Sequence, residues 1–357
     1  MGESPIVVEE PLLVERFAEV LRVDRLAELL PGDIYPPYLY LAAFLVIDFG
    51  IVNTYSHVTG DATYVLLDSP YVVVGPLGLL LAAVGISYLF SNYASAVEGL
   101  PLDSLDRDDI AVFERIVPFR VKLVVYGIAV VGVYVNGIVN VGLGNIVATE
   151  GAAGLINWLF VWEVGYIPFV VEFGLMYFGV HVLLPRRIAN ADVTMFFYDP
   201  RNMGGFASVG QLLKHSYYLY TAGLLLYFVL TYGSVLFSFG GTVPTKPGVV
   251  EAVFFSAAWT IGVASIAYSM MTLHRVMASK KEQRINELEA DIEDIIRNPY
   301  DINKSEVTDE ERLKDIDRRR QEISDTRVYP ATFTMWSQII ISVLLPQALN
   351  MAVQAVG

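Results

Sequence analysis

Residues 155–184 read LINWLFVWEVGYIPFVVEFGLMYFGVHVLL, and this stretch decides the fold. Its only acidic side chains are Glu163 and Glu172, and most of the other residues are aliphatic or aromatic. A helix needs about 20 such residues to cross the hydrocarbon core of a bilayer, which is roughly 30 Å thick. The stretch is therefore predicted to be a membrane-spanning helix.

Similar apolar runs recur along the chain, in which 54% of the 357 residues are hydrophobic and only 17% are charged. This composition excludes a soluble globule and a disordered chain. We predict an all-α, polytopic integral membrane protein with about seven transmembrane helices. The expected spans are 35–55, 70–93, 117–141, 155–184, 215–239, 249–273 and 330–353.

The basic residues orient these spans. Of the 24 lysines and arginines, all except Lys246 fall in alternate connections between the predicted helices. Because basic residues concentrate in cytoplasmic loops, this segregation predicts a multi-pass protein of the cell membrane with a cytoplasmic N-terminus and an extracellular C-terminus.

The chain divides into four regions. We expect a cytoplasmic amphipathic N-terminal segment at 1–34, transmembrane helices 1 to 6 at 35–274, a cytoplasmic helical hairpin at 275–329, and transmembrane helix 7 with an external C-terminus at 330–357. The N-terminal segment is expected to lie along the inner face of the membrane.

The hairpin is predicted from helical periodicity that continues beyond the sixth span. Ile285, Leu288, Ile292 and Ile295 follow coiled-coil spacing until the pair Asn298-Pro299 ends the helix. The run Thr308-Asp309-Glu310-Glu311 is then a capping box that opens a second helix. Two antiparallel helices joined at 298–308 should result, and their apolar seams are candidate contacts for a second subunit or a protein partner.

Acidic residues dominate the charge, with a formal net charge of −14 and 17 arginines against 7 lysines. Excess carboxylate with little lysine keeps a surface hydrated at high salt, so we expect a halophilic archaeon as the source, with a cation-binding surface as the alternative. The same charge makes nucleic acid an improbable partner. The chain has no cysteine, which excludes disulfides and thiolate chemistry.

The helix starts suggest an internal repeat. Residues 38–42 (YLYLA) and 218–222 (YLYTA) open the predicted first and fifth helices on the same side of the membrane. A 3+1+3 arrangement would place the two copies in one orientation, with the fourth helix as the connecting crossing. Chance similarity between short Tyr/Leu/Ala strings is the alternative.

Three carboxylates fall inside the predicted spans: Asp48, Glu163 and Glu172. A charged side chain within the bilayer costs at least about 2.5 kcal/mol, so it normally faces protein or water and marks a functional site. Nine residues of regular helix would turn Glu163 and Glu172 to opposite faces, but Pro168 between them can distort the helix and free the carbonyl of Val164.

Together with Asn136 and Asn140, these acids are expected to line a polar transport path for a cation, a proton or a small solute. The alternative is that the polar side chains only hold helices together through hydrogen bonds, each contributing about 0.6–2 kcal/mol.

The loop before the fifth span is a candidate gate. Gly204 and Gly205 could act as a hinge and Phe206 as a plug, while a plain tight connection is the alternative. His181, His215 and His274 fall near the inner ends of three helices and could form a shared site, although none has metal-ligand spacing, so no metal or cofactor is expected.

The sequence contains no catalytic motif, so an enzyme acting on lipid is the weakest of the function classes considered. We expect an oligomeric channel or transporter that contacts membrane lipids. The alternative is a membrane-embedded scaffold or signalling subunit that acts through its cytoplasmic hairpin.

Overall fold

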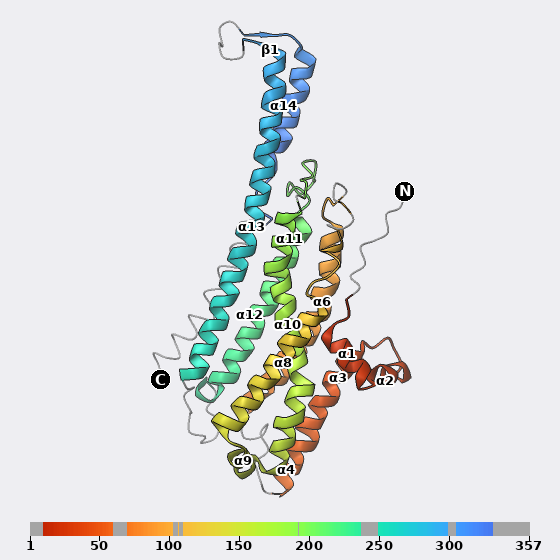
Figure 1. The fold of residues 1–357 in the computed structure, drawn as a ribbon, viewed down its shortest axis with the longest axis vertical. Helices are drawn as coiled ribbons and strands as arrows, with labels where there is room; N and C mark the ends of the chain where they lie inside the picture. Colours follow the sequence, from red (N-terminus) through yellow and green to blue (C-terminus); the bar gives the residue numbers. More distant parts are fainter. Residues whose placement is uncertain are drawn as a thin grey trace.

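The computed structural model describes residues 10–59, 70–102, 106, 110–191, 193–236, 249–298 and 305–330. These residues form a mostly helical protein with one two-stranded ribbon (Figure 1). Five helical segments among them are long and apolar enough to cross a membrane: Pro36–Thr59, Pro70–Glu98, Phe119–Val139, Ala153–Asn190 and Val253–Ile295. The predicted fold class is thus confirmed in its coarse form, a helical protein with several candidate membrane spans.

The count of seven spans stays a prediction. The expected span at 215–239 overlaps α12 (Ala207–Leu236), a 30-residue helix that is not among the five candidates. The expected span at 330–353 lies almost entirely outside the described residues. One half of the proposed repeat therefore lacks a described third helix, and the repeat also stays a prediction.

Four of the five spans are composite helices. The first span consists of α3 (Pro36–Leu45), η1 (Val46–Val52) and α4 (Asn53–Thr59). The second consists of η2 (Pro70–Val73) and α6 (Val74–Glu98). The fourth begins within α9 (Leu143–Ile156) and continues through η4 (Asn157–Tyr166), α10 (Ile167–Phe178), η5 (Gly179–Leu183) and α11 (Leu184–Asn190). The third span starts with α8 (Phe119–Val135) and runs into η3 (Asn136–Val141). Except for the 3-10 turn η2, the segments marked η are π-helical, a rare geometry that is frequent at functional sites.

The segment Ala153–Asn190 is the central helix of the bundle, because it is more buried than the other four candidate spans. Its α10 part packs against α6 and α8, and its last two elements, η5 and α11, pack against α13 (Val249–Ile295). At Gly165, a Cβ atom would lie 2.4 Å from the ring of Phe44 in α3. The absence of a side chain at Gly165 therefore lets α3 approach the central helix closely.

The N-terminal segment packs into this bundle instead of lying only along its surface. It contains α1 (Leu13–Val20) and α2 (Val23–Leu29). Leu12, Leu13 and Val14 are each at most 1% exposed, and α1 packs against α3, α8 and α10. The apolar face of α1 thus faces protein, and the expected position of the segment along the inner face of a membrane stays a prediction.

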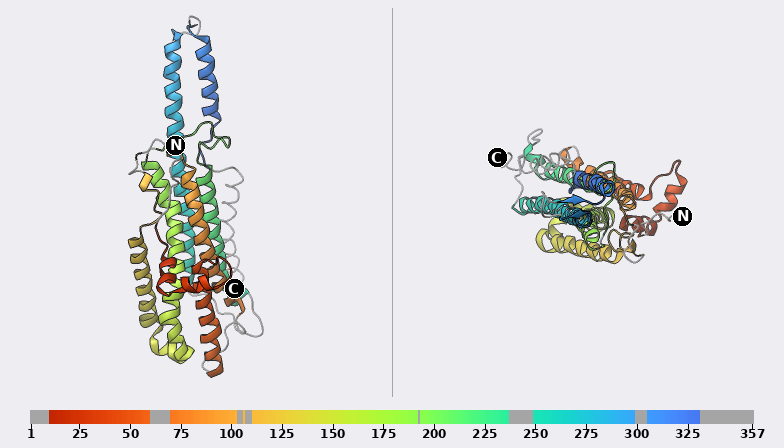
Figure 2. Two further views of the ribbon diagram at one scale, coloured as in Figure 1. Left: turned by 90° about the vertical axis from the view of Figure 1, so that its right-hand side faces the viewer. Right: turned by 90° about the horizontal axis from the view of Figure 1, so that it is seen from above.

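Helix α13 continues for 47 residues from the bundle into a projecting hairpin (Figures 1 and 2). Strands β1 (Ile296–Arg297) and β2 (Glu306–Val307) pair antiparallel at its end, and α14 (Glu310–Asp325) returns along α13. Asp309 caps α14 by accepting the N–H of Arg312 at 3.0 Å. Leu288, Ile295, Ile316 and Ile323 form the buried seam between the two helices.

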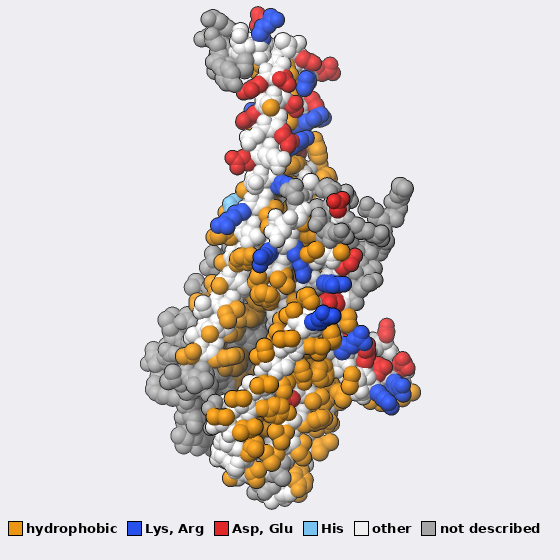
Figure 3. Space-filling view, in the orientation of Figure 1, with side chains coloured by type: hydrophobic (Ala, Val, Ile, Leu, Met, Phe, Trp, Pro, Cys, Tyr) orange, Lys and Arg blue, Asp and Glu red, His pale blue; other side chains and the backbone are white. Residues whose placement is uncertain are grey.

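Charged side chains separate the two parts of the molecule. In Figure 3, hydrophobic side chains cover the lower bundle, Lys and Arg side chains gather across its upper boundary, and mixed charges cover the hairpin. Such a basic boundary is typical of the cytoplasmic end of a membrane domain. On which side of a membrane the hairpin lies stays a prediction.

Candidate functional site

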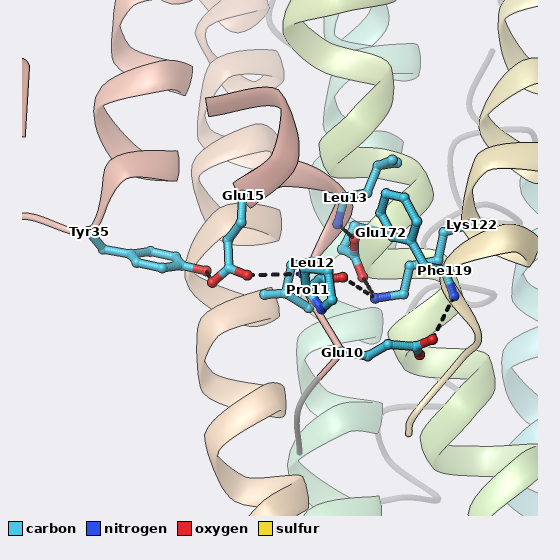
Figure 4. Close-up of polar contacts among 9 residues, drawn as sticks. All are labelled: Glu10, Pro11, Leu12, Leu13, Glu15, Tyr35, Phe119, Lys122 and Glu172. Atoms are coloured by element: carbon cyan, nitrogen blue, oxygen red, sulfur yellow. Dashed lines mark hydrogen bonds and ion pairs between the residues drawn. The ribbon is translucent and has the colours of Figure 1, made fainter. Parts of the chain in front are cut away.

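Glu172 forms a buried ion pair with Lys122, which lies in the first turn of α8 (Figure 4). The distance between Lys122 Nζ and Glu172 Oε1 is 2.9 Å, and the two residues are only 2% and 0% exposed. The other carboxylate oxygen, Oε2, accepts a short hydrogen bond from the backbone N–H of Leu13. Glu172 therefore joins three segments that are far apart in sequence: the N-terminal segment, α8 and α10.

The N-terminal segment makes further polar contacts around this pair (Figure 4). Its carbonyl at Pro11 accepts a hydrogen bond from Lys122 Nζ at 3.5 Å. Glu10 Oε1 accepts the N–H of Phe119, the first residue of α8, at 3.0 Å. An acidic side chain at this position satisfies a free N–H at the start of a helix and suits the helix dipole.

Glu15 fixes the segment from its other side. Its two oxygens accept the N–H of Leu12 at 3.0 Å and the hydroxyl of Tyr35 at 2.7 Å. The hydroxyl of Tyr35, which directly precedes α3, therefore ties the start of that helix to the same polar cluster.

Glu163, nine residues before Glu172, has different surroundings. It is 2% exposed, and neither of its carboxylate oxygens has a hydrogen-bond partner among the described residues. Its neighbours are Tyr126 and Tyr134 of α8, which lie close enough to interact with its charge. Their hydroxyls donate to the backbone carbonyls of Glu163 at 3.1 Å and Leu159 at 3.2 Å.

The two glutamates thus both have their neighbours on α8. Lys122 and Tyr126 lie one turn apart on that helix, opposite Glu172 and Glu163 respectively. A regular helix would place the two glutamates on opposite faces, and the π-helical geometry of η4 between Asn157 and Tyr166 removes that regularity. The expected distortion between Glu163 and Glu172 is therefore present.

Pro168 has the local effect that its chemistry predicts. It lacks an N–H, so the carbonyl of Val164 has no donor within the helix. The hydroxyl of Tyr40 in α3 donates a short hydrogen bond to that carbonyl. The freed oxygen is thus used by the protein itself and is not open to a ligand in this conformation.

Asp48 lies in a separate cluster between η1 and η4. It is 5% exposed and accepts hydrogen bonds from Tyr166 Oη at 2.7 Å, Asn157 Nδ2 at 3.0 Å and Asn53 Nδ2 at 3.3 Å. These three donors satisfy the carboxyl group of Asp48 and offset part of the cost of its burial. Within the described ranges, no hydrogen bond or ion pair connects Asp48 to Glu163 or Glu172.

The structure leaves open whether the two asparagines predicted to line the path belong to this site. Asn136 begins η3 and is exposed at the surface, and the side chain of Asn140 lies outside the described residues. Their assignment to a transport path stays a prediction, while the three acids are placed in buried positions.

The candidate gate at 204–206 forms a tight connection. Asp199 accepts the backbone N–H groups of Arg201, Met203 and Gly205 at 3.0–3.1 Å. Gly204 and Gly205 have φ values of +61° and +87°, which only glycine adopts readily. Phe206 is fully buried in the main core, so its aromatic ring anchors α12; its proposed role as a plug stays a prediction.

The three histidines are held by different groups. His181 Nδ1 lies 3.3 Å from Ser269 Oγ, His215 Nδ1 lies 2.8 Å from Tyr88 Oη, and His274 Nδ1 lies 2.9 Å from the carbonyl of Val328. Across the described ranges, no group of three or more His, Asp or Glu side chains could hold a metal ion. Nothing in this part of the chain therefore brings the histidines into a shared site.

Sequence reasoning missed the partners of the acids. The sequence around Lys122, which follows Arg120 at the start of a span, is typical of a basic residue at the membrane interface. No local feature distinguishes it from a lysine exposed to water. Tyr166 and Asn157 flank Glu163 in sequence, but their side chains donate hydrogen bonds to Asp48, which lies on another helix.

Comparison with known proteins found no matching family model, no similar curated protein and no similar solved structure.

Proposed function

We propose that this protein is a membrane transport protein that moves protons or small cations along the interface between α8 and the Ala153–Asn190 helix. The observation that carries the proposal is Glu163, a carboxylate that is 2% exposed and has no hydrogen-bond partner at either oxygen within the part of the chain that the structure describes. An ionised carboxylate without a partner is too costly to keep in such surroundings. Glu163 is therefore suited to carry a proton or to meet a cation.

The ion pair of Lys122 and Glu172 would act as the inner gate of this path. Lys122 Nζ occupies the position in which a transported cation would meet Glu172, so the two compete for one carboxylate. A proton arriving at Glu172 would have the same effect, because a neutral carboxyl no longer holds the ammonium group. Release of Lys122 would then also loosen the carbonyl of Pro11, which accepts from the same Nζ.

The positions of the acids along the helices support a path between two levels. Lys122 lies at the start of α8 and Tyr126 one turn further along, while Asp48 is held by Asn157 and Tyr166, which lie on either side of Glu163 in η4. With the predicted orientation, a proton or cation would pass from the level of Asp48 and Glu163 to Glu172 on the inner side.

The scaffold function has less support. The apolar residues of α13 and α14 that were candidates for partner contacts pack against each other in the hairpin seam. Leu288, Ile295, Ile316 and Ile323 thus cover one another, and of the seam residues predicted on α13 only Ile285 and Ile292 keep part of their surface exposed among the described residues.

Purified protein in lipid vesicles tests the transport proposal. A trapped pH-sensitive dye would report proton flux under an imposed pH gradient, and parallel vesicles would carry Na⁺ or K⁺ gradients. We expect Glu163→Gln to lower the flux of the transported ion at least tenfold. The matched control is Glu311→Gln, the same change at an exposed position of α14. Flux of Glu163→Gln within twofold of the wild type would contradict the proposal.

A further inference from the structure

A cavity of about 380 Å³ lies at the base of the hairpin. Three segments form its walls. The loop after α11 contributes Thr194, Met195, Phe196, Phe197 and Tyr198, and one face of α13 contributes Lys280, Gln283, Arg284 and Glu287. The last turns of α14 contribute Arg319, Glu322 and Ile323. Small-molecule sites in proteins typically occupy about 300–1,000 Å³. The cavity is thus large enough for a polar headgroup.

The loop that forms one wall is held in place by its own hydrogen bonds. The N–H of Phe196 donates to the carbonyl of Gly204 at 3.1 Å, and the N–H of Arg327 beyond α14 donates to the carbonyl of Asn202 at 2.8 Å. Asp199 further closes the turn through three backbone N–H groups. These bonds keep Phe196 and Tyr198 beside the hairpin, so the site is formed before any ligand arrives.

The polar lining is basic overall, with Lys280, Arg284 and Arg319 against Glu287 and Glu322. The side chains of Arg284 and Arg319 are 46% and 45% exposed, so both guanidinium groups can reach a ligand in the cavity. Arg284 pairs with Glu287, and Arg319 pairs with Asp315 at 2.6 Å. Exposed pairs of this kind are weak, and a phosphate competes well for arginine because it accepts two parallel hydrogen bonds.

The two acids in the lining limit the class of ligand. Glu287 and Glu322 would repel a second anionic group, but their oxygens can accept hydrogen bonds from hydroxyl groups. The cavity therefore fits one phosphate that carries a hydroxylated substituent, with the phosphate toward the arginines and the hydroxyl groups toward the glutamates.

The position of the cavity points to a lipid source. Lys280 lies seven residues beyond the predicted end of the sixth span at 273, which is about 10 Å along a helix. Phe196 and Tyr198 are 50% and 59% exposed, and aromatic side chains of this kind favour the headgroup zone of a membrane. The basic boundary in Figure 3 runs across the same end of the bundle.

We propose that this cavity binds the headgroup of an anionic, hydroxyl-bearing phospholipid such as phosphatidylglycerol. Arg284, Arg319 and Lys280 hold the phosphate, Glu287 and Glu322 accept from the headgroup hydroxyls, and Phe196 and Tyr198 cover the glycerol end of the lipid. The bound lipid would link the loop after the central helix to both helices of the hairpin.

The test measures binding of short-chain phosphatidylglycerol to the purified full-length protein in detergent, with calorimetry as the readout. The double variant Arg284→Gln/Arg319→Gln should bind at least tenfold more weakly, because it loses two charged donors to the phosphate. The matched control is Arg318→Gln/Arg320→Gln, which removes the same charge from neighbouring positions that do not line the cavity. The control should bind within twofold of the wild type.

Two further ligands test whether the headgroup hydroxyls are recognised and whether the bound phosphate belongs to a lipid. Short-chain phosphatidylcholine, which has no hydroxyl group on its headgroup, should bind at least tenfold more weakly than phosphatidylglycerol. Glycerol 3-phosphate should also bind much more weakly, because it lacks the acyl chains. Equal loss of affinity in both double variants would overturn the site, and equal affinity for glycerol 3-phosphate would overturn the lipid as its ligand. Thermal unfolding of each variant confirms that it is folded before binding is measured.

Discussion

Glu163 and Glu172 occupy one helix, have the same side chain and both face α8, yet their surroundings differ. Glu172 has an ammonium group at 2.9 Å and a backbone N–H, whereas Glu163 has no hydrogen-bond partner among the described residues. A carboxylate with a cation partner stabilises the contact between segments, and one without a partner must change its protonation or find a cation. The comparison separates a carboxylate whose ion pair joins three segments until a proton or cation displaces Lys122 from one that has no such partner among the described residues.

The largest expected effect comes from breaking the ion pair at one end. Glu172→Gln leaves Lys122 buried without a counter-charge, so we expect a loss of about 3–5 kcal/mol in the free energy of unfolding. Glu163→Gln breaks no ion pair and should change it by less than about 1 kcal/mol. Denaturant unfolding in mixed micelles measures both variants. Similar losses in the two variants would remove the distinction between the glutamates.

Replacing both members of the pair sharpens the same comparison. Apolar residues of similar volume often replace a buried ion pair without loss of stability, so Lys122→Met/Glu172→Met should be more stable than either single variant. We expect it to lie within about 2 kcal/mol of the wild type, because the N–H of Leu13 loses its acceptor. A double-mutant cycle with the two single changes gives the coupling energy. Additive losses would mean that the pair does not act as a unit.

Asp48 provides an intermediate case, since its donors are neutral. Tyr166→Phe removes the hydroxyl that donates to Asp48 Oδ2 at 2.7 Å. Losing this bond leaves a buried carboxyl oxygen without its donor, so we expect a loss of about 1–3 kcal/mol in unfolding free energy. Tyr134→Phe is the matched control, because its hydroxyl donates to a backbone carbonyl at 3.2 Å and not to a buried carboxyl group. A larger loss in the control than in Tyr166→Phe would contradict this role of Tyr166.

The smallest effect is expected outside the membrane, at Asp199. Partial burial alone would raise the pKa of this carboxyl, but the N–H groups of Arg201, Gly205 and Met203 and the charge of Arg201 outweigh it and hold the pKa below its usual value. The stabilisation is therefore present above the unfolded pKa of about 3.9 and is lost as the pH falls through the lower folded pKa.

Asp199→Asn should accordingly lose about 0.5–1 kcal/mol at neutral pH, after allowing for solvent screening, and nothing at a pH below the folded pKa. Unfolding curves of both proteins between pH 2 and about pH 7 measure this difference. A constant difference across that range would show that the charge of Asp199 plays no part.

Much of the helical fold could be predicted from the sequence. The expected spans beginning at residues 35, 70, 117, 155 and 249 each overlap one of the five candidate membrane helices. A run of about 20 apolar residues is by itself evidence of a membrane-spanning helix, so the hydropathy pattern is sufficient to predict these five helices. The extent of the central helix was underestimated, because the polar residues up to Asn190 continue it beyond the apolar run.

The candidate site was predictable only in part. The cost of a buried carboxylate identifies Asp48, Glu163 and Glu172, and all three are at most 5% exposed. Their partners depend on which helices pack together, and no local pattern encodes that Lys122 meets Glu172 or that Leu13 enters the bundle. The packing of α1 against α3, α8 and α10 could not be predicted for the same reason, because amphipathicity does not distinguish lipid from protein as the apolar neighbour, and its position relative to a membrane stays a prediction.

The unbroken course of α13 has a mechanical consequence. Its 47 residues make a rod of about 70 Å that has one end among the membrane helices and the other at the tip of the hairpin. Near the membrane end, Ser265 and Ser269 of this rod contact Tyr177 and His181 of the central helix. A sideways force on the tip would therefore act as torque on the helix that carries Glu163 and Glu172, with the fulcrum where α13 leaves the bundle.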